Sequence, residues 1–246
     1  MSLKKLLVVL LFGTLVMGCN EQSAVFKAGQ VATERNVYLA DIIHELSEKW
    51  PDNRAVNIVC HGHSVPAGYF ATPTVDTFNS YPHLLHKTLK GKYDNAVINV
   101  IVTAIGGEDS VSGAKRFKAA VLNHKPDVVL IDYALNDRSA GLERSLKAWS
   151  EMIGMAKAED VKVLLLTPTL DVNHVPGVSQ EPLNQHAEQI RSLAAEYNVG
   201  LVDSLAAFDM ELKKGTKTAE LLSNGWNHPN RRGHEIVVHE ILKWFN

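Results

Sequence analysis

Residues 55–64 read Ala55-Val56-Asn57-Ile58-Val59-Cys60-His61-Gly62-His63-Ser64, in which a mainly apolar run over 55–60 precedes a turn of small and polar residues. Near-continuous runs of Val, Ile and Leu are typical of strands that are buried on both faces, as in a parallel sheet. Four similar runs follow, at 96–103, 127–131, 161–166 and 199–202.

Segments with helical spacing of apolar residues separate these runs and flank them. Strands and helices in alternation predict βαβ units with right-handed crossovers and helices on both faces of the sheet. The sequence therefore predicts an α/β fold with three layers, α/β/α, around a five-stranded parallel sheet. The predicted helices lie at about 35–49, 80–91, 110–123, 141–157, 182–197 and 231–244.

The composition is that of a globular protein. Of 246 residues, 46% are hydrophobic and 21% are charged, which is enough apolar material for one sizeable core. The formal net charge is −2. No basic surface is implied, so we expect no nucleic-acid partner.

The first residues predict export. Lys4 and Lys5 precede the apolar run 6–12 and small residues before Cys19, which describes a signal peptide over 1–18 that is short for a spanning helix. Residues 15–19, Leu-Val-Met-Gly-Cys, resemble a bacterial lipobox, whose cysteine is lipidated and becomes the mature N-terminus. That resemblance implies an exported lipoprotein of the cell envelope, with lipidation at Cys19 and contact with the membrane through this lipid. Residues 19–33 would form a tether and 34–246 the folded domain; an ordinary secretory signal is the alternative.

Unusual residues follow several of the predicted strands. Ligand sites of open parallel sheets lie beyond the carboxyl ends of the strands. Ser64, Gly106-Gly107 and Asn136 follow the first three strands, and the last segment leads to His228. A serine hydroxyl needs an imidazole to take its proton and donors to hold the oxyanion that forms. Ser64 and His228 are therefore the candidate nucleophile and base.

In this order the residues resemble the SGNH hydrolases, also called the GDSL family, whose name lists Ser, Gly, Asn and His from four separate blocks. The resemblance covers most of residues 55–240 and implies a flavodoxin-like fold. In this chain His63 stands in place of an Asp, Ala134 in place of a Gly, and Gly225 in place of the usual acid. The blocks are Gly62-His63-Ser64, Ala104 to Ser110 with Gly107 as the best match and Gly106 as the fallback, Ala134-Leu135-Asn136-Asp137, and Gly225-Trp226-Asn227-His228-Pro229.

The resemblance implies a role for each residue. Ser64 would attack an ester carbonyl, and His228 would take its proton and later give it to the leaving alcohol. The backbone N–H groups of Ser64 and Gly107 and the side-chain amide of Asn136 would form the oxyanion hole. The implied activity is that of a serine esterase that hydrolyses carboxylic esters without a cofactor or metal. The substrate would be a small-molecule or saccharide ester, and an exported location is compatible with acetylated carbohydrate.

How His228 is oriented stays open at this point, because no acid stands at position 225. A backbone carbonyl could hold the imidazole, which would give a Ser-His dyad. Asp171 is the other candidate orienter, in an atypical triad, because it follows the fourth strand and should lie at the same edge of the sheet.

Two other functions compete with the esterase. A catalytically silent surface lipoprotein that binds glycans would explain the missing acid. A metal-dependent hydrolase could use His61 and His63, with further ligands from Asp132, Asp171 or His174. Cys60 closes an apolar run, and we expect it to be a buried structural residue.

Overall fold

The computed structural model describes residues 33–246. The predicted signal peptide, the lipidation site Cys19 and all but the last residue of the predicted tether lie outside this range. None of the helices within it is long and apolar enough to cross a membrane.

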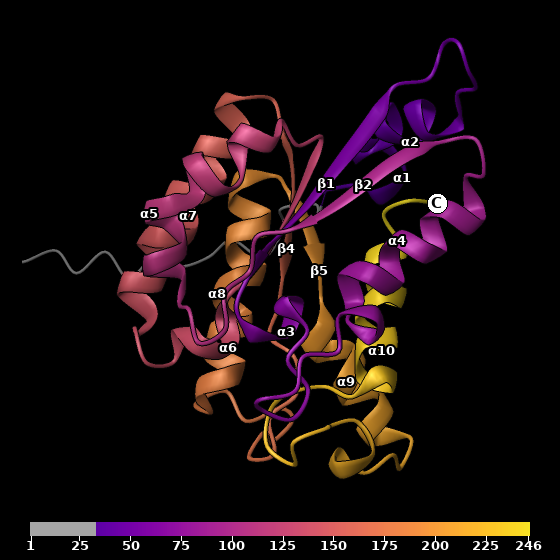
Figure 1. Cartoon of the computed structure of the whole chain (residues 1–246). Helices are drawn as coiled ribbons and strands as arrows, with labels where there is room; N and C mark the ends of the chain where they lie inside the picture. The colour runs from indigo at the N-terminus through magenta and orange to yellow at the C-terminus, as the bar shows by residue number, and fades with distance from the viewer. Residues whose placement is uncertain (1–32) are drawn as a thin grey trace, which may run out of the picture.

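A single sheet of five parallel strands forms the centre of the molecule (Figure 1). The strand order β2-β1-β3-β4-β5 is that of flavodoxin-like folds, so the predicted fold class is confirmed. The order reverses next to β1, and such a switch point is where open α/β sheets bind ligands. The strands are β1 (Ala55–Gly62), β2 (Val97–Val102), β3 (Val128–Asp132), β4 (Lys162–Leu166) and β5 (Gly200–Val202).

Helices cover both faces of the sheet (Figure 1). One face packs against α5 (Ser110–Ala120), α7 (Leu142–Ala158) and α8 (Pro182–Tyr197). The other packs against α2 (Ala40–Ser47), α4 (Tyr81–Lys92), α9 (Ser204–Lys213) and α10 (Arg231–Leu242). The remaining pieces are short: α1 (Arg35–Tyr38), α3 (Ser64–Ala67), α6 (Ala134–Asp137) and the 3₁₀ turns η1 (Thr77–Asn79), η2 (Leu122–His124) and η3 (Thr218–Glu220).

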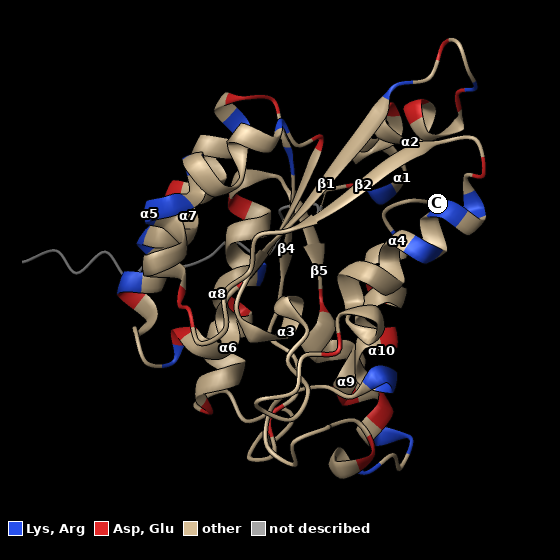
Figure 2. Cartoon of the chain, in the orientation of Figure 1, with Lys and Arg blue, Asp and Glu red and all other residues tan. Residues whose placement is uncertain are grey.

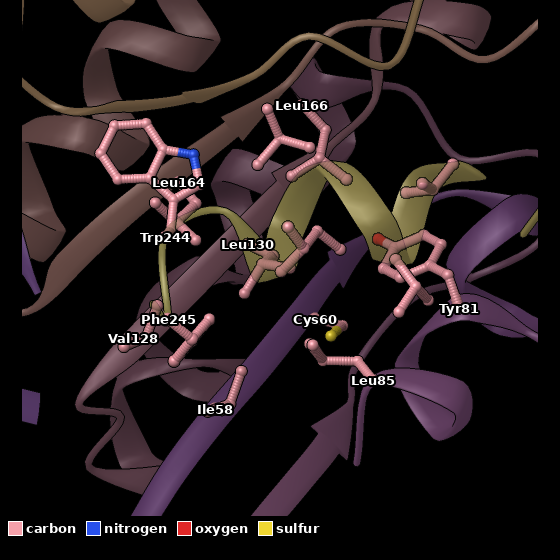
Figure 3. Packing of buried hydrophobic residues seen from close by; sticks show 14 of the residues in the cluster. Ile58, Cys60, Tyr81, Leu85, Val128, Leu130, Leu164, Leu166, Trp244 and Phe245 are labelled. Atoms are coloured by element: carbon pink, nitrogen blue, oxygen red, sulfur yellow. The ribbon is translucent and has the colours of Figure 1, made fainter. Parts of the chain in front are cut away.

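Alternate residues of each strand enter two apolar clusters, one on each face of the sheet. Ile58 and Cys60 belong to the cluster beneath α4 and α10, whereas Val59 belongs to the one beneath α5 and α7. Figure 3 shows Cys60 between the strands and the α4 residues Tyr81 and Leu85. Cys60 is fully buried, and its burial raises the pKa of the thiol. A neutral, inaccessible thiol fits the structural role predicted for it.

Charged residues lie mainly on the helices and the loops, and few lie in the strands (Figure 2). Lysine and arginine are interspersed with aspartate and glutamate on the side that this view shows. The carboxyl ends of the strands, around α3 and α6, are where the candidate site residues come together.

Candidate active site

The turn that carries Ser64 begins at Gly62, the last residue of β1, which pairs with Asp132 of β3. A Cβ added at Gly62 would lie 2.3 Å from the backbone oxygen of Asp132, so only glycine fits there. The chain then makes the single helical turn α3, which ends at Gly68 with a left-handed φ of 87°. Ser64 is the first residue of α3 and therefore lies at the carboxyl edge of the sheet.

Ser64 and His228 face one another. The Ser64 Oγ lies 3.0 Å from His228 Nε2, and the two residues are only 7% and 8% exposed. The Nδ1 of His228 lies 2.9 Å from the backbone oxygen of Phe70, which can only accept a hydrogen bond. This assigns the proton to Nδ1 and leaves Nε2 to accept from the serine. Burial lowers the pKa of His228, which favours the neutral imidazole that a base requires.

A tight loop fixes the backbone of His228. The Asn224 Oδ1 accepts hydrogen bonds from the backbone N–H groups of Trp226, Asn227 and His228, at 2.9, 2.9 and 3.0 Å. Gly225 adopts a left-handed φ of 66° within this loop, and a Cβ there would meet no atom within 4 Å. Asn224 therefore orders the segment in which the acid of the family is missing.

Asp171 does not contact the imidazole. Its carboxylate accepts a hydrogen bond of 2.9 Å from Arg138 Nη2 and one of 2.8 Å from the backbone N–H of Asn173. The expectation that Asp171 orients His228 is thus not met, because His228 Nδ1 faces the Phe70 carbonyl while the Asp171 carboxylate bonds to Arg138 and to its own loop. The arrangement is that of a Ser-His dyad held by a backbone carbonyl.

The three expected oxyanion donors are available. The Asn136 Nδ2 donates to the backbone oxygen of Glu108 at 3.0 Å, which uses one of its two N–H groups and orients the other. The backbone N–H groups of Ser64 and Gly107 donate to no acceptor within residues 33–246. Gly107 has a φ of 79°, a conformation that glycine adopts readily.

The loop of Gly107 lies against the end of β1. The backbone N–H of Ile105 donates to the oxygen of Gly62 at 3.0 Å. A Cβ at Gly106 would come within 2.9 Å of the Tyr69 ring, whose centroid is 6.4 Å from that of His228. Glycine thus has a different reason at each position: Gly107 has a positive φ, and a side chain at Gly106 would come too close to Tyr69.

Buried polar contacts anchor this loop to the helices behind it. Glu108 accepts from Arg116 Nε at 2.7 Å and from the Tyr133 hydroxyl at 2.7 Å. Asp137, next to Asn136, accepts from the backbone N–H of Ser110 at 2.8 Å and from Trp149 Nε1 at 2.7 Å. These contacts connect the beginning of α5 to α6 and α7.

His61 and His63 belong to separate networks. The Nδ1 of His61 lies 2.9 Å from the Thr103 hydroxyl, and its Nε2 lies 3.1 Å from the Tyr133 hydroxyl. His63 contacts the α3 turn and Asp132, whereas His174 lies between Glu181 and Asp209. Within residues 33–246 no three His, Cys, Asp or Glu side chains are arranged to hold a metal ion. The geometry therefore gives the metal-dependent alternative no ligand set.

Four contributors to the site do not stand out in the sequence. Phe70 acts through its backbone carbonyl, a group that every residue carries. Glu108 and Arg116 carry no family signature, although a glutamate beside the glycine pair and an arginine eight residues later on α5 could have suggested an ion pair. Asn224 was visible only as a polar residue near the missing acid.

Comparisons with known proteins identify the family of the chain. The GDSL-like lipase/acylhydrolase family matches residues 60–236. The esterase TesA of Pseudomonas aeruginosa is 34% identical over 108 residues, which are 42% of this chain and 51% of that protein. The match thus spans about half the length of this curated relative.

Two solved structures have a similar fold. An acetylxylan esterase from Geobacillus stearothermophilus matches with a TM-score of 0.67 and 22% identity, over 78% of this chain and 94% of that one. A two-domain esterase active on acetylated mannans matches with a TM-score of 0.69 and 21% identity, over 85% of this chain and 52% of that one. The family match reaches from the end of β1 into α10 and so includes all four blocks. The chain belongs to the GDSL-like lipase/acylhydrolase family.

Proposed function

We propose that this protein is a serine esterase that hydrolyses carboxylic esters through the dyad of Ser64 and His228. The observation that carries the proposal is the 3.0 Å contact between Ser64 Oγ and His228 Nε2, with Nδ1 fixed on the Phe70 carbonyl. A hydroxyl placed on a neutral imidazole in a buried site is the arrangement of an activated nucleophile.

The reaction follows from this geometry. The Ser64 Oγ attacks the ester carbonyl carbon while its proton moves to His228 Nε2, and the negative charge develops on the carbonyl oxygen. The N–H groups of Ser64, Gly107 and Asn136 would hold that oxygen. The imidazolium then returns the proton to the departing alcohol oxygen, which leaves an acyl group on Ser64. A water molecule activated by the same imidazole releases the carboxylic acid.

The proposed substrates are esters of carbohydrates, with acetyl esters first among them. The two similar solved structures are named as esterases of acetylated xylan and mannans. The side chain of Trp226 is 57% exposed two residues before the base, and its flat ring suits the apolar face of a sugar. The backbone oxygen of Trp226 accepts from Val172 N at 2.7 Å, which fixes this part of the rim.

We further propose that the enzyme is exported and anchored in the cell envelope by lipid on Cys19. The basic start, the apolar run and the lipobox-like Leu-Val-Met-Gly-Cys at 15–19 support this location. Metabolic labelling with a palmitate analogue should mark the full chain and should not mark Cys19→Ala. Labelling of both proteins, or of neither, would contradict the anchor without affecting the esterase assignment.

The activity is tested with a panel of acetylated oligosaccharides and short-chain and long-chain esters, on the wild type and Ser64→Ala. We expect turnover of the acetyl sugars by the wild type, no turnover by Ser64→Ala, and labelling of Ser64 by a fluorophosphonate probe. An inert Ser64 in a protein that binds glycans would favour the silent binding protein instead. Activity that survives the probe and disappears with a chelator would favour a metal.

A further inference from the structure

A buried histidine and a buried carboxylate lie next to the nucleophile. His63 precedes Ser64, and Asp132 is the last residue of β3, opposite Gly62 in the strand register. The two side chains are 0% and 1% exposed, and the His63 Nε2 lies 3.3 Å from Asp132 Oδ1. The backbones are also joined, because the N–H of His63 donates to the oxygen of Asp132 at 3.2 Å.

The tautomer of His63 follows from its other nitrogen. The Nδ1 accepts a hydrogen bond of 3.1 Å from the backbone N–H of Val65 and so caps the α3 turn. The proton of a neutral ring is then on Nε2, the nitrogen that faces the carboxylate. The His63 imidazole therefore has two roles. Its Nδ1 accepts a hydrogen bond from the turn that carries Ser64, and its Nε2–H faces Asp132.

Asp132 depends on this ring for compensation. The Nε2 and Oδ1 atoms lie 3.3 Å apart but lack the alignment of a hydrogen bond, and neither carboxylate oxygen has a hydrogen-bonding partner within residues 33–246. The buried Tyr81 hydroxyl also has none there, and burial together with the Asp132 charge raises the pKa of Tyr81. Burying a carboxylate with so few partners is costly. The side chain at position 63 therefore determines how well the Asp132 carboxylate is compensated.

We propose that His63 and Asp132 form a coupled pair that positions Ser64, in which each residue requires the other. An aspartate at 63 could cap the turn equally well, as the family block has it, but it would bring a second carboxylate against Asp132 where water cannot screen them. Histidine retains an acceptor for the cap in its Nδ1, and it places an N–H donor beside Asp132 where an aspartate would place a second negative charge. The pair thereby holds Ser64 so that its Oγ faces His228 Nε2. This inference rests on the proposed esterase function for its kinetic test.

The test is a substitution cycle measured as kcat and KM on the same acetyl ester. We expect His63→Asp to lower kcat about tenfold to a hundredfold with little change in KM, because a displaced nucleophile slows the chemical step. Adding Asp132→Asn should restore kcat to within about threefold of the wild type, because the like charge is gone and the cap remains. His63→Asn, a neutral cap, should lose less activity than His63→Asp. Replacement of the exposed His44 by Asp is the matched control and should change neither constant.

Unfolding by urea gives a readout of the same cycle that needs no substrate. We expect His63→Asp to lower the free energy of unfolding, and the added Asp132→Asn to recover most of it. Equal kcat for His63→Asp with and without Asp132→Asn would overturn the coupling, as would a His63→Asn that is no more active than His63→Asp. Coupling in stability without coupling in kcat would overturn the positioning role. A wild type that hydrolyses no ester would refute the proposed function, while the unfolding cycle would still decide whether the two residues are coupled.

Discussion

The imidazole of His228 rests on a peptide carbonyl, where hydrolases with a full triad use a carboxylate. The Phe70 oxygen fixes the tautomer and orientation of the ring, which are two of the functions of the acid. It provides a dipole and not a charge to the imidazolium that forms during the reaction. Burial lowers the pKa of His228 and outweighs the hydrogen bond to the Phe70 carbonyl, which acts in the opposite direction, so the neutral form is favoured.

The pH dependence of kcat/KM reports this residue directly. His228 must be neutral to accept the serine proton, so activity is lost as pH falls through its pKa, and this pKa lies below the ordinary 6.5. We therefore expect a profile that is flat above pH about 6.5 and falls only in more acidic solution. Stopped-flow or titrimetric rates on a non-ionising ester measure it. A midpoint above 6.5 would contradict the neutral, buried base.

Replacement of Asn136 tests the oxyanion hole. Asn136→Ala removes a side-chain amide that the Glu108 backbone oxygen orients. The oxyanion of the transition state then loses a hydrogen-bond donor that contributes little to binding of the substrate itself. We expect kcat to fall about a hundredfold to a thousandfold while KM changes little. Asn99→Ala on β2 is the control, because Asn99 is exposed and its side chain bonds only to Asn57 in the part of the chain described. An unchanged kcat in Asn136→Ala would remove this amide from the site.

Among the elements, the strands follow closely from the sequence. The ends of each predicted strand agree with the observed ends to within two residues. A strand that is buried on both faces has an apolar run with polar residues at either end, and this pattern marks its limits. The helix α9 was not predicted. Only Leu205 and Phe208 of its apolar residues are fully buried, which is too short a pattern to indicate a helix. The contacts of Asp171 and Phe70 depend on how loops fold back, and local residue patterns do not encode this.

The loop before α10 gives a prediction about element geometry. Asn224→Ala removes the acceptor of three backbone N–H groups, so the loop loosens and His228 no longer faces Ser64 reproducibly. We expect kcat/KM to fall about tenfold to a hundredfold. Asn224→Asp retains an oxygen acceptor and should stay within about threefold of the wild type. A drop of equal size in both variants would show that the oxygen acceptor is not what matters.

At the scale of the whole molecule, the site exists only in the folded chain. Ser64 and His228 are 164 residues apart in sequence, and the strand order and the packing of α10 on α4 bring them together. Ser64, Gly107 and Asn136 follow strands, and parallel strands present their carboxyl ends at one edge. His228 follows no strand directly and faces Ser64 from the loop before α10. What the sequence alone could not predict was which loop would supply the partner of His228 Nδ1.

Buried histidines make the stability of the whole domain depend on pH. Burial lowers the pKa of His61 and His186 to about 4 and that of His234 to about 3. The unfolded chain, with ordinary values near 6.5, binds more protons than the folded one between these values. The free energy of unfolding is therefore largest above pH about 6.5 and decreases as pH falls toward 4, by up to about 1.4 kcal/mol per pH unit for each histidine.

Urea unfolding at pH 7 and pH 5 measures this decrease, and His186→Gln should reduce it because one buried titrating group is removed. The exposed His44 provides the comparison, since His44→Gln should leave the difference between the two pH values unchanged. A stability that is the same at both pH values would contradict the burial of these histidines in their neutral form.

Gly225 bears on how the sequence of this protein can change over generations. Every glycine codon becomes an acidic codon by the same substitution at its second base, so the lineage of this chain is always a single mutation from an aspartate or glutamate at position 225. The open space there and a left-handed φ that aspartate tolerates mean that selection would meet little steric resistance to it. A new carboxylate would instead have to compete with the Phe70 carbonyl for the same imidazole proton. A single mutation thus separates the dyad from a sequence with the acid of a triad. The hydrogen bond from His228 to the Phe70 carbonyl would still have to break for that acid to bind the imidazole.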